Sequence, residues 1–503
     1  MSGATFLSLP NELVTMIAHY CADAYPLCLV NQRILPFAQQ GLYHTINLPH
    51  THYNQLVLLV RTLVETPHLR RLIREVDISL GPDAYYDPST METPTNLTNW
   101  PRFILDESKL SDTDRHILLL YRPYATFSRT SPPLAVGLLV GMLLCFGHRI
   151  CSLTISQMQV THLTSHRLQL IGLRSMLLVA ISAFSAMKQR VCPELKSLSL
   201  LPSPIHPQYD CMFGSDFNFL EHFVAYPTLA TFVSSYDLGI WGLHDRPGYR
   251  TSLPTKQLIL RRTGMKSATL GRALRRFTNL THLFVDFDPS PLRVQILIGH
   301  NVGTILELGA AITKSCPCIE HLTLKVCEQG NLKFFGENPT LEIRSLINST
   351  LELSGLKVFR SRIAMYYSLL ETLDERATLV KNWLPRQAET LLLDTTDTEE
   401  DVMGVPYFQG VKSLILSLCQ AHHENQLSFR TMVIAVGAGG NIDWKEVVKE
   451  AREYGAGTDF RLMVVFFPTM SQAFWDDTWR QEMDIPASLS AEDQRGNAIV
   501  DSG

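Results

Sequence analysis

The chain has 503 residues, of which 46% are hydrophobic and 18% charged, and its formal net charge at pH 7 is −4. Its length favours more than one folded unit, and its low content of charged residues excludes a largely disordered chain. The small net charge gives no sign of the basic face that a nucleic-acid-binding protein presents, so we expect no nucleic-acid partner.

A short amphipathic helix is predicted close to the start of the chain. Pro10 suits a first helical turn, where its missing N–H is not needed. Five apolar residues recur at helical spacing and share one face: Leu9, Leu13, Met16, Ile17 and Tyr20. A second helix carries Leu27, Val30 and Ile34. Periodicity alone leaves two interpretations open, a hairpin packed on its own domain and a hairpin that docks onto another protein.

The order of residue types over residues 5–48 is more specific than the periodicity. It runs Leu9-Pro10-x-Glu12-Leu13-x3-Ile17, then Leu27-x2-Val30-Asn31, then Gly41-Leu42-Tyr43 and Ile46-x-Leu48. This order resembles the F-box, and the Leu-Tyr pair near its end is usual in fungal versions of that motif. Val30 comes earlier than in a usual member, because the loop at residues 22–24 is short.

The resemblance implies helix-in-groove docking onto a Skp-family adaptor, which would link the chain to a cullin–RING ubiquitin ligase. Carried over by position in the motif, the adaptor-binding residues are Leu9, Pro10, Leu13, Ile17, Leu27 and Val30. The resemblance also implies that the rest of the chain holds an unknown target protein and that the chain itself catalyses nothing.

Two long apolar stretches bear on membrane insertion. The first, Leu134–Phe146, is shorter than the ~20 residues that a membrane-spanning helix needs. The second, Leu168–Met187, carries Arg174 and Ser175 near its middle. Both are predicted to be buried helices, and no basic start followed by an apolar run marks a signal peptide. We therefore expect no membrane partner.

A six-residue string, apolar-x-x-apolar-x-apolar, recurs along the rest of the chain. Its copies are IREVDI (73–78), ICSLTI (150–155), LKSLSL (195–200), LTHLFV (280–285), IEHLTL (319–324), AETLLL (388–393) and VKSLIL (411–416), with weaker copies LATFVS (229–234), TKQLIL (255–260) and LKVFRS (356–361). In a leucine-rich repeat such a string forms a short strand, and parallel strands stack along a solenoid. Segments of helical character separate several copies.

The predicted fold class is therefore α/β, with N-terminal F-box helices followed by an irregular leucine-rich-repeat-like solenoid with parallel strands. The irregular period leaves open a generic parallel α/β fold with buried strands. A last strand–helix–strand unit is predicted at 431–436, 444–454 and 460–467, and the polar composition beyond Ile485 predicts disorder. The expected domains are 1–48 for the F-box-like helices, 49–484 for the solenoid and 485–503 for the tail.

Motifs for enzyme chemistry are missing from the sequence. The ten cysteines form no CxxC pair, which disfavours a zinc site and indicates a reducing compartment, the cytoplasm or the nucleus. The segment VGAGGN (436–441) lacks the glycine spacing and the Gly-Lys ending of phosphate loops. The acidic run Asp394–Asp401 is interpreted as a solvated loop. We expect no catalytic residues, no cofactor and no metal.

Target binding is predicted on the long loops that follow the strands. The loop at 234–254 holds residue types that are enriched in binding hot spots, namely Tyr236, Trp241, Arg246 and Tyr249. The alternative is that Tyr236 and Trp241 tuck under the loop as a small core. The leading hypothesis for the whole chain is the substrate-receptor subunit of an SCF-type ligase. The alternatives are a non-ligase leucine-rich-repeat scaffold, with its helices docked internally, and an α/β enzyme, which the missing motifs disfavour.

Overall fold

The fold is seen in a computed structural model, in which two compact units divide the chain. The described residues are 9–21, 25–48, 53–80, 132–157, 190–201, 226–235, 252–263, 273–287, 312–326, 353–362, 387–394, 415–424, 429–437, 461–467 and 499–501, with one or two residues at a time between these ranges. Residues 1–236 form most of the first unit, and residues 256–503 form most of the second.

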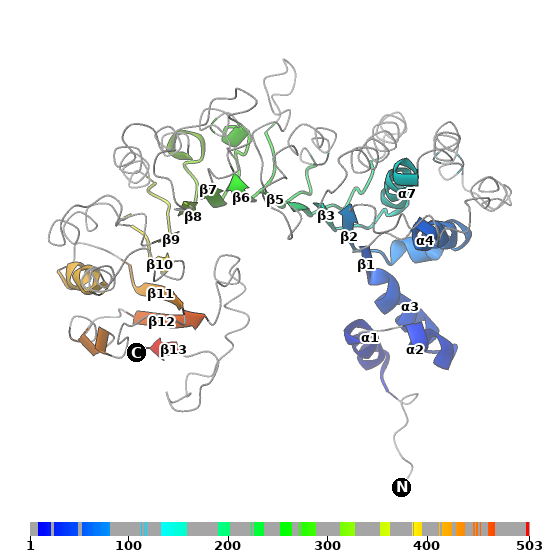
Figure 1. The fold of residues 1–503 in the computed structure, drawn as a ribbon, viewed down its shortest axis with the longest axis horizontal. Coiled ribbons are helices and arrows are strands. Elements are labelled where there is room, and N and C mark those ends of the chain that lie inside the picture. Colours follow the sequence, from blue (N-terminus) through cyan, green and yellow to red (C-terminus); the bar gives the residue numbers. More distant parts are fainter. Residues whose placement is uncertain are drawn as a thin grey trace, which may run out of the picture. The chain divides into compact units, whose positions relative to one another are not determined.

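The first unit begins with three short helices and continues as strands covered by longer helices (Figure 1). Its elements are α1 (Asn11–Tyr20), α2 (Tyr25–Val30), α3 (Leu35–His44), β1 (Thr45–Leu48), α4 (Tyr53–Glu65), the 3-10 helix η2 (Pro67–Arg71), β2 (Glu75–Leu80), α7 (Pro132–Phe146), β3 (Ser152–Gln157), β4 (Ser197–Leu201) and β5 (Thr231–Ser235). The five strands pair in sequence order, and every pair is parallel.

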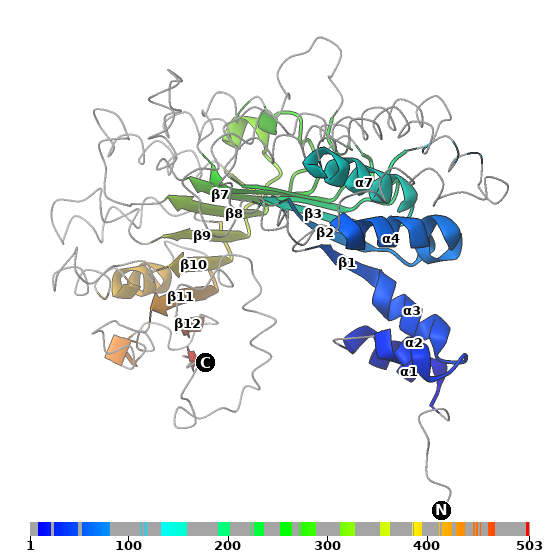
Figure 2. The ribbon, with the colours of Figure 1, turned by 45° about the vertical axis from the view of Figure 1, so that its right-hand side comes forward.

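One face of this sheet forms the core of the first unit. Side chains alternate between the two faces of a strand, so one residue from each strand lines up across the ladder. The buried row consists of Ile46, Val76, Leu153, Leu198 and Phe232. Helices α4 and α7 lie along one side of these strands in both ribbon views (Figure 2). Burying each large aliphatic side chain of the row stabilises the fold by about 1.5–3 kcal/mol.

Helix α7 is the apolar stretch that was predicted to be a buried helix, and the prediction is confirmed. It has 15 residues, and its side chains from Leu138 to Phe146 are at most 1% exposed. Among the described residues, no helix combines the length and the apolar character that a membrane span requires.

The second unit carries the same architecture further along the chain. Its strands are β6 (Gln257–Thr263), β7 (His282–Phe287), β8 (His321–Val326), β9 (Val358–Arg362), β10 (Thr390–Asp394), β11 (Thr431–Gly437), β12 (Arg461–Phe467) and β13 (Ile499–Asp501). Strands β6 to β12 pair in sequence order and in parallel, and β13 adds antiparallel to β12. The buried row in register is Leu258, Leu283, Leu322, Phe359, Leu391, Met432 and Leu462.

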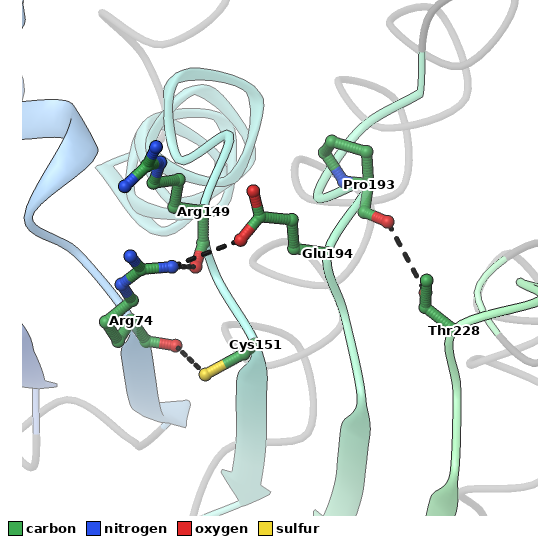
Figure 3. Close-up of polar contacts among 6 residues, drawn as sticks. All are labelled: Arg74, Arg149, Cys151, Pro193, Glu194 and Thr228. Atoms are coloured by element: carbon green, nitrogen blue, oxygen red, sulfur yellow. Dashed lines mark hydrogen bonds and ion pairs between the residues drawn. The ribbon is translucent and has the colours of Figure 1, made fainter.

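Hydrogen bonds at the strand starts repeat from one unit of the pattern to the next. The carbonyl of Cys151 accepts the N–H groups of Lys196 and Ser197, at 2.8 and 3.0 Å, and equivalent pairs recur along both units. Side chains join the same region, where the Cys151 thiol donates to the Arg74 carbonyl at 3.2 Å and the Thr228 hydroxyl donates to the Pro193 carbonyl at 3.4 Å (Figure 3). Such neighbour-to-neighbour stacking is the construction of a solenoid.

The repeated string predicts the strands with a constant offset. In every copy except VKSLIL, the strand begins two residues after the string begins, as β3 does in ICSLTI and β8 in IEHLTL. The copy VKSLIL is wrong as a strand, because Lys412 and residues 415–423 are helical. Its apolar residues continue to Leu418 and Cys419 at helical spacing, and both are fully buried. The strand of this repeat is β11.

The two ends of the chain also refine the expected boundaries. Strand β1 lies within the segment 1–48 that was expected to be helical, and it pairs with β2 over four residue pairs. In the expected disordered tail, Ile499–Asp501 instead forms β13, which pairs with residues 463–465 of β12. A partner strand orders this short segment although its polar surroundings favour disorder. The rest of the tail lies outside the described residues.

Arg70 is expected to stabilise the junction between α4 and η2. Its side chain is 6% exposed, donates hydrogen bonds to the carbonyls of Leu63 and Val64, and lies 4.5 Å from the ring centroid of Phe146. Arg70→Met keeps the aliphatic stem but leaves these helix-end carbonyls unpaired, which costs about 1.5–3 kcal/mol. Chemical denaturation of Arg70→Met measures this loss. The exposed neighbour Arg71 supplies the control, and equal effects of Arg70→Met and Arg71→Met would contradict the assignment.

Candidate docking surface of the N-terminal helices

Helix α1 begins after Pro10, and a narrow stripe of its side chains is buried against the rest of the chain. Pro10 has an extended backbone, with φ −56° and ψ 149°, and its carbonyl accepts the N–H of Val14 at 3.1 Å. Val14 and Ala18, four residues apart, are 4% and 1% exposed. The wider apolar face of the helix, which begins at Leu13, therefore points away from the stripe that packs on the rest of the chain.

Helix α3 crosses α1 at a glycine. Gly41 lies so close to α1 that an added Cβ would press on the carbonyl oxygen of Ala18 and lie 2.8 Å from its carbonyl carbon. The two helices thus meet backbone to backbone at this point. The turn between α2 and α3 is held by Asn31, whose side-chain oxygen accepts the N–H of Arg33 at 2.8 Å.

The three helices enclose a small core of their own. Val14, Ile34 and Ala38 are buried at its centre, and four partly buried residues pack against them: Leu9, Leu27, Cys28 and Phe37. Two of the residues that the motif predicted for adaptor binding, Leu9 and Leu27, thus also contribute to this internal core. Their side chains support the arrangement of the helices in addition to any contact with a partner.

Most large exposed apolar side chains of the described residues gather on α1 and α2. We call the outer apolar surface the set Leu13, Met16, Ile17, Tyr20, Tyr25, Leu29 and Val30, whose exposed fractions run from 37% to 81%. In the part of the chain that the structure describes, the one other large apolar side chain that is comparably exposed is Leu58. Exposed apolar side chains that gather on neighbouring elements are typical of a protein–protein interaction site.

The predicted adaptor residues divide between the two sides of the helices. Leu13, Ile17 and Val30 belong to the outer apolar surface, and Pro10 is exposed beside it. Sequence reasoning missed Tyr25 and Leu29, which are 59% and 72% exposed. The signal was present, because the six residues of α2, YPLCLV, are almost all apolar, and none of them is fully buried.

The residues predicted to bind the target cannot be placed. Tyr236, Trp241, Arg246 and Tyr249 lie outside the described residues. Within the described residues, no cluster of three or more His, Cys, Asp or Glu side chains could hold a metal ion.

The buried cysteines are unsuited to nucleophilic chemistry. Burial raises the pKa of Cys316 and of Cys419 to about 12, and it raises the pKa of Cys192 further still. A thiol with such a raised pKa holds its proton at neutral pH, whereas a nucleophilic cysteine acts as the thiolate. These three side chains therefore act as small apolar groups in the core.

Comparison with known proteins adds no family to this description. No protein-family model matches the sequence, and no curated protein matches it significantly. The fold and the site define the class of the protein instead: a parallel α/β, solenoid-like body that follows a three-helix segment with an exposed apolar surface.

Proposed function

We propose that this chain is the substrate-receptor subunit of an SCF-type cullin–RING ubiquitin ligase. Its F-box-like helices bind a Skp-family adaptor, and its leucine-rich-repeat-like body binds a target protein. The observation that carries the proposal is the outer apolar surface on α1 and α2, because it falls on the segment whose order of residue types resembles the F-box.

The energetics favour a partner for this surface. Seven large apolar side chains exposed on two short helices leave apolar area in contact with water. Covering one such side chain completely is worth about 1.5–3 kcal/mol, so even partial burial of several would support a stable complex. A helix-in-groove contact uses residues at this helical spacing.

The alternative function, a non-ligase scaffold, requires the helices to dock on their own domain. In that case the face that starts at Leu13 would be buried within the chain. Leu13, Ile17 and Tyr20 are instead 41%, 37% and 81% exposed, and the inward contacts of α1 come from Val14 and Ala18. The exposure of this face therefore supports the receptor over the scaffold.

The receptor would contribute proximity and no chemistry of its own. Holding the target beside the ligase raises the effective concentration of the target's lysines near the transferred ubiquitin. The cytoplasmic or nuclear location expected from the cysteine content belongs to the same proposal, as does the absence of cofactors.

Reconstitution tests the proposed function. The full chain is mixed with a purified Skp-family adaptor, and the mass of the complex is measured by size-exclusion chromatography with light scattering. We expect an equimolar complex that then retains a cullin–RING module. Adaptor that is already saturated with another F-box segment is the control and should not bind. If the free adaptor also fails to bind, the ligase function is wrong.

A further inference from the structure

The sheet of the first unit has a second face, opposite its apolar core, that is lined by small polar residues. One row in register across β1 to β4 consists of Asn47, Asp77, Thr154 and Ser199. Ser152 and Ser197 flank it on β3 and β4. We call these six residues the polar sheet face. Asn47 is exposed and the others are partly exposed, and α4 and α7 lie along one side of the sheet only (Figure 2).

The charge on this face is entirely negative in the described residues. Asp77 is its ionisable group, Glu75 lies two residues away on the same strand, and β1 and β3 bring no charged side chain to either of them. Glu75 accepts a hydrogen bond from the Thr45 hydroxyl at 3.1 Å, and this hydroxyl lies 3.2 Å from Nδ1 of His44.

The basic residue just before β2 is already paired. Arg74 lies at the start of β2, and its guanidinium makes an ion pair with Glu194 at 3.1 Å and reaches the Arg149 carbonyl (Figure 3). Asp77 is therefore left with neither an ion pair nor a hydrogen bond to a neighbouring strand in the described part of the chain.

The fold gains nothing evident from the carboxylate of Asp77. Its Oδ1 atom is buried and has no hydrogen-bond partner among the described residues, and partial burial raises the pKa of this carboxyl. Removing a charged oxygen from water without a partner is unfavourable. The neighbouring positions in register hold short polar side chains, Asn47 on β1 and Thr154 on β3.

We propose that the polar sheet face binds a cationic, extended segment of a partner protein, with a Lys or Arg side chain placed against Asp77. The cation would supply the ion pair and the hydrogen bonds that the carboxylate lacks, and an arginine can make them with two parallel N–H groups. The hydroxyl and amide groups around it would bond the partner's backbone. The identification of this partner as the ligase's target rests on the proposed function, but the binding itself does not require the adaptor.

Peptide binding tests the inference directly. The full chain is applied to arrays of equal-length basic, neutral and acidic peptides, and the strongest binders are titrated by fluorescence anisotropy. We expect basic peptides to dominate, and we expect Asp77→Asn to weaken them at least tenfold. The matched control is Asp112→Asn, because Asp112 is an exposed carboxylate that lies outside the polar sheet face. No binding by any class of peptide, equal binding by neutral peptides, or unchanged binding by Asp77→Asn would each overturn the inference.

A second variant provides an independent test in case Asp77→Asn does not fold. Asn47 is exposed and lies directly beside Asp77 in the β1–β2 register. Asn47→Lys would offer Asp77 a cation from within the chain and repel a basic partner, so it should cause the same loss. Adaptor binding should be unchanged in both variants. If basic peptides bind and the adaptor does not, the ligase-receptor function is wrong, but the binding of basic peptides to the polar sheet face remains supported.

Thermal stability separates a binding role of Asp77 from a structural one. Because the pKa of Asp77 is raised in the folded state, the fold disfavours its charged form. This cost is fully present above the folded-state pKa. It declines as the pH falls from there towards the ordinary pKa of an aspartate, below which the carboxyl is protonated in both states. Asp77→Asn should therefore raise the melting temperature at neutral pH while it weakens peptide binding. A lower melting temperature would indicate a structural carboxylate and would overturn the inference.

Discussion

The double substitution Leu13→Ala, Ile17→Ala is expected to abolish adaptor binding while the melting temperature of the chain stays unchanged. Both side chains belong to the outer apolar surface and are 41% and 37% exposed, so the folded chain loses little packing without them. In the complex each would be covered by the adaptor, and each truncation should cost about 1–2 kcal/mol of binding free energy. Together they should weaken binding on the order of a hundredfold or more, as measured by calorimetric titration.

Leu58→Ala supplies the matched control for this prediction. Leu58 lies on α4, is 57% exposed, and is apolar like the residues of the outer apolar surface. Its truncation should leave adaptor affinity unchanged. Equal losses from Leu58→Ala and from the double variant would show that the adaptor binds by nonspecific hydrophobic association and not through the α1 face.

The structure also changes which residues should be mutated. The motif alone favours Leu9 and Pro10, because they open it. Leu9, however, packs against the internal core of Val14, Ile34 and Ala38. A loss of binding in Leu9→Ala would therefore mix a structural effect with a binding effect, whereas the Leu13 and Ile17 pair isolates the surface.

Gly41→Ala is expected to displace α1 from α3 and to lower adaptor affinity as a consequence. Gly41 lies within α3, where helix propensity alone would make alanine more stable by about 1 kcal/mol. The added methyl group would meet the backbone carbonyl of Ala18, which cannot move without moving α1. Overpacking of this kind costs about 1–3 kcal/mol, so the net effect should be destabilising. Faster hydrogen exchange over residues 11–44 measures it.

Gly355→Ala is the corresponding control in the second unit. An added Cβ there would lie 3.7 Å from the nearest atom, the carbonyl oxygen of Ile319, which is an ordinary contact distance. The variant should exchange hydrogen like the wild-type chain. If Gly41→Ala also leaves the hydrogen-exchange rates unchanged, the close crossing of α1 and α3 does not constrain the positions of the two helices.

The strands could be predicted from the sequence because a local rule generates them. Each string places its apolar residues where a parallel strand buries them, and a constant turn precedes the strand, as in the Leu195 N–H to Cys192 carbonyl bond at 3.1 Å. The rule failed at VKSLIL because six residues cannot distinguish a strand from part of a helix. The continuation to Leu418 and Cys419 carries the helical period.

The candidate surface was only partly predictable. The motif located the helices, but periodicity assigns residues to a face without saying whether that face points to the core. Only the packing shows that Leu27 turns partly inward and that Tyr25 and Leu29 turn outward. The polar sheet face left a signal too, in the serines and threonines of ICSLTI and LKSLSL, and the carboxylate of Asp77 stands out only once β1 and β3 are placed beside it.

Hydrogen exchange of the full chain, with and without a purified Skp-family adaptor, tests the central claim most directly. The account predicts that the adaptor slows exchange in peptides covering α1 and α2, from Asn11 to Val30, and leaves the strands of the body unchanged. Protection confined to the body, or no protection at saturating adaptor, would contradict the assignment of the N-terminal helices as the docking surface of a ubiquitin-ligase receptor.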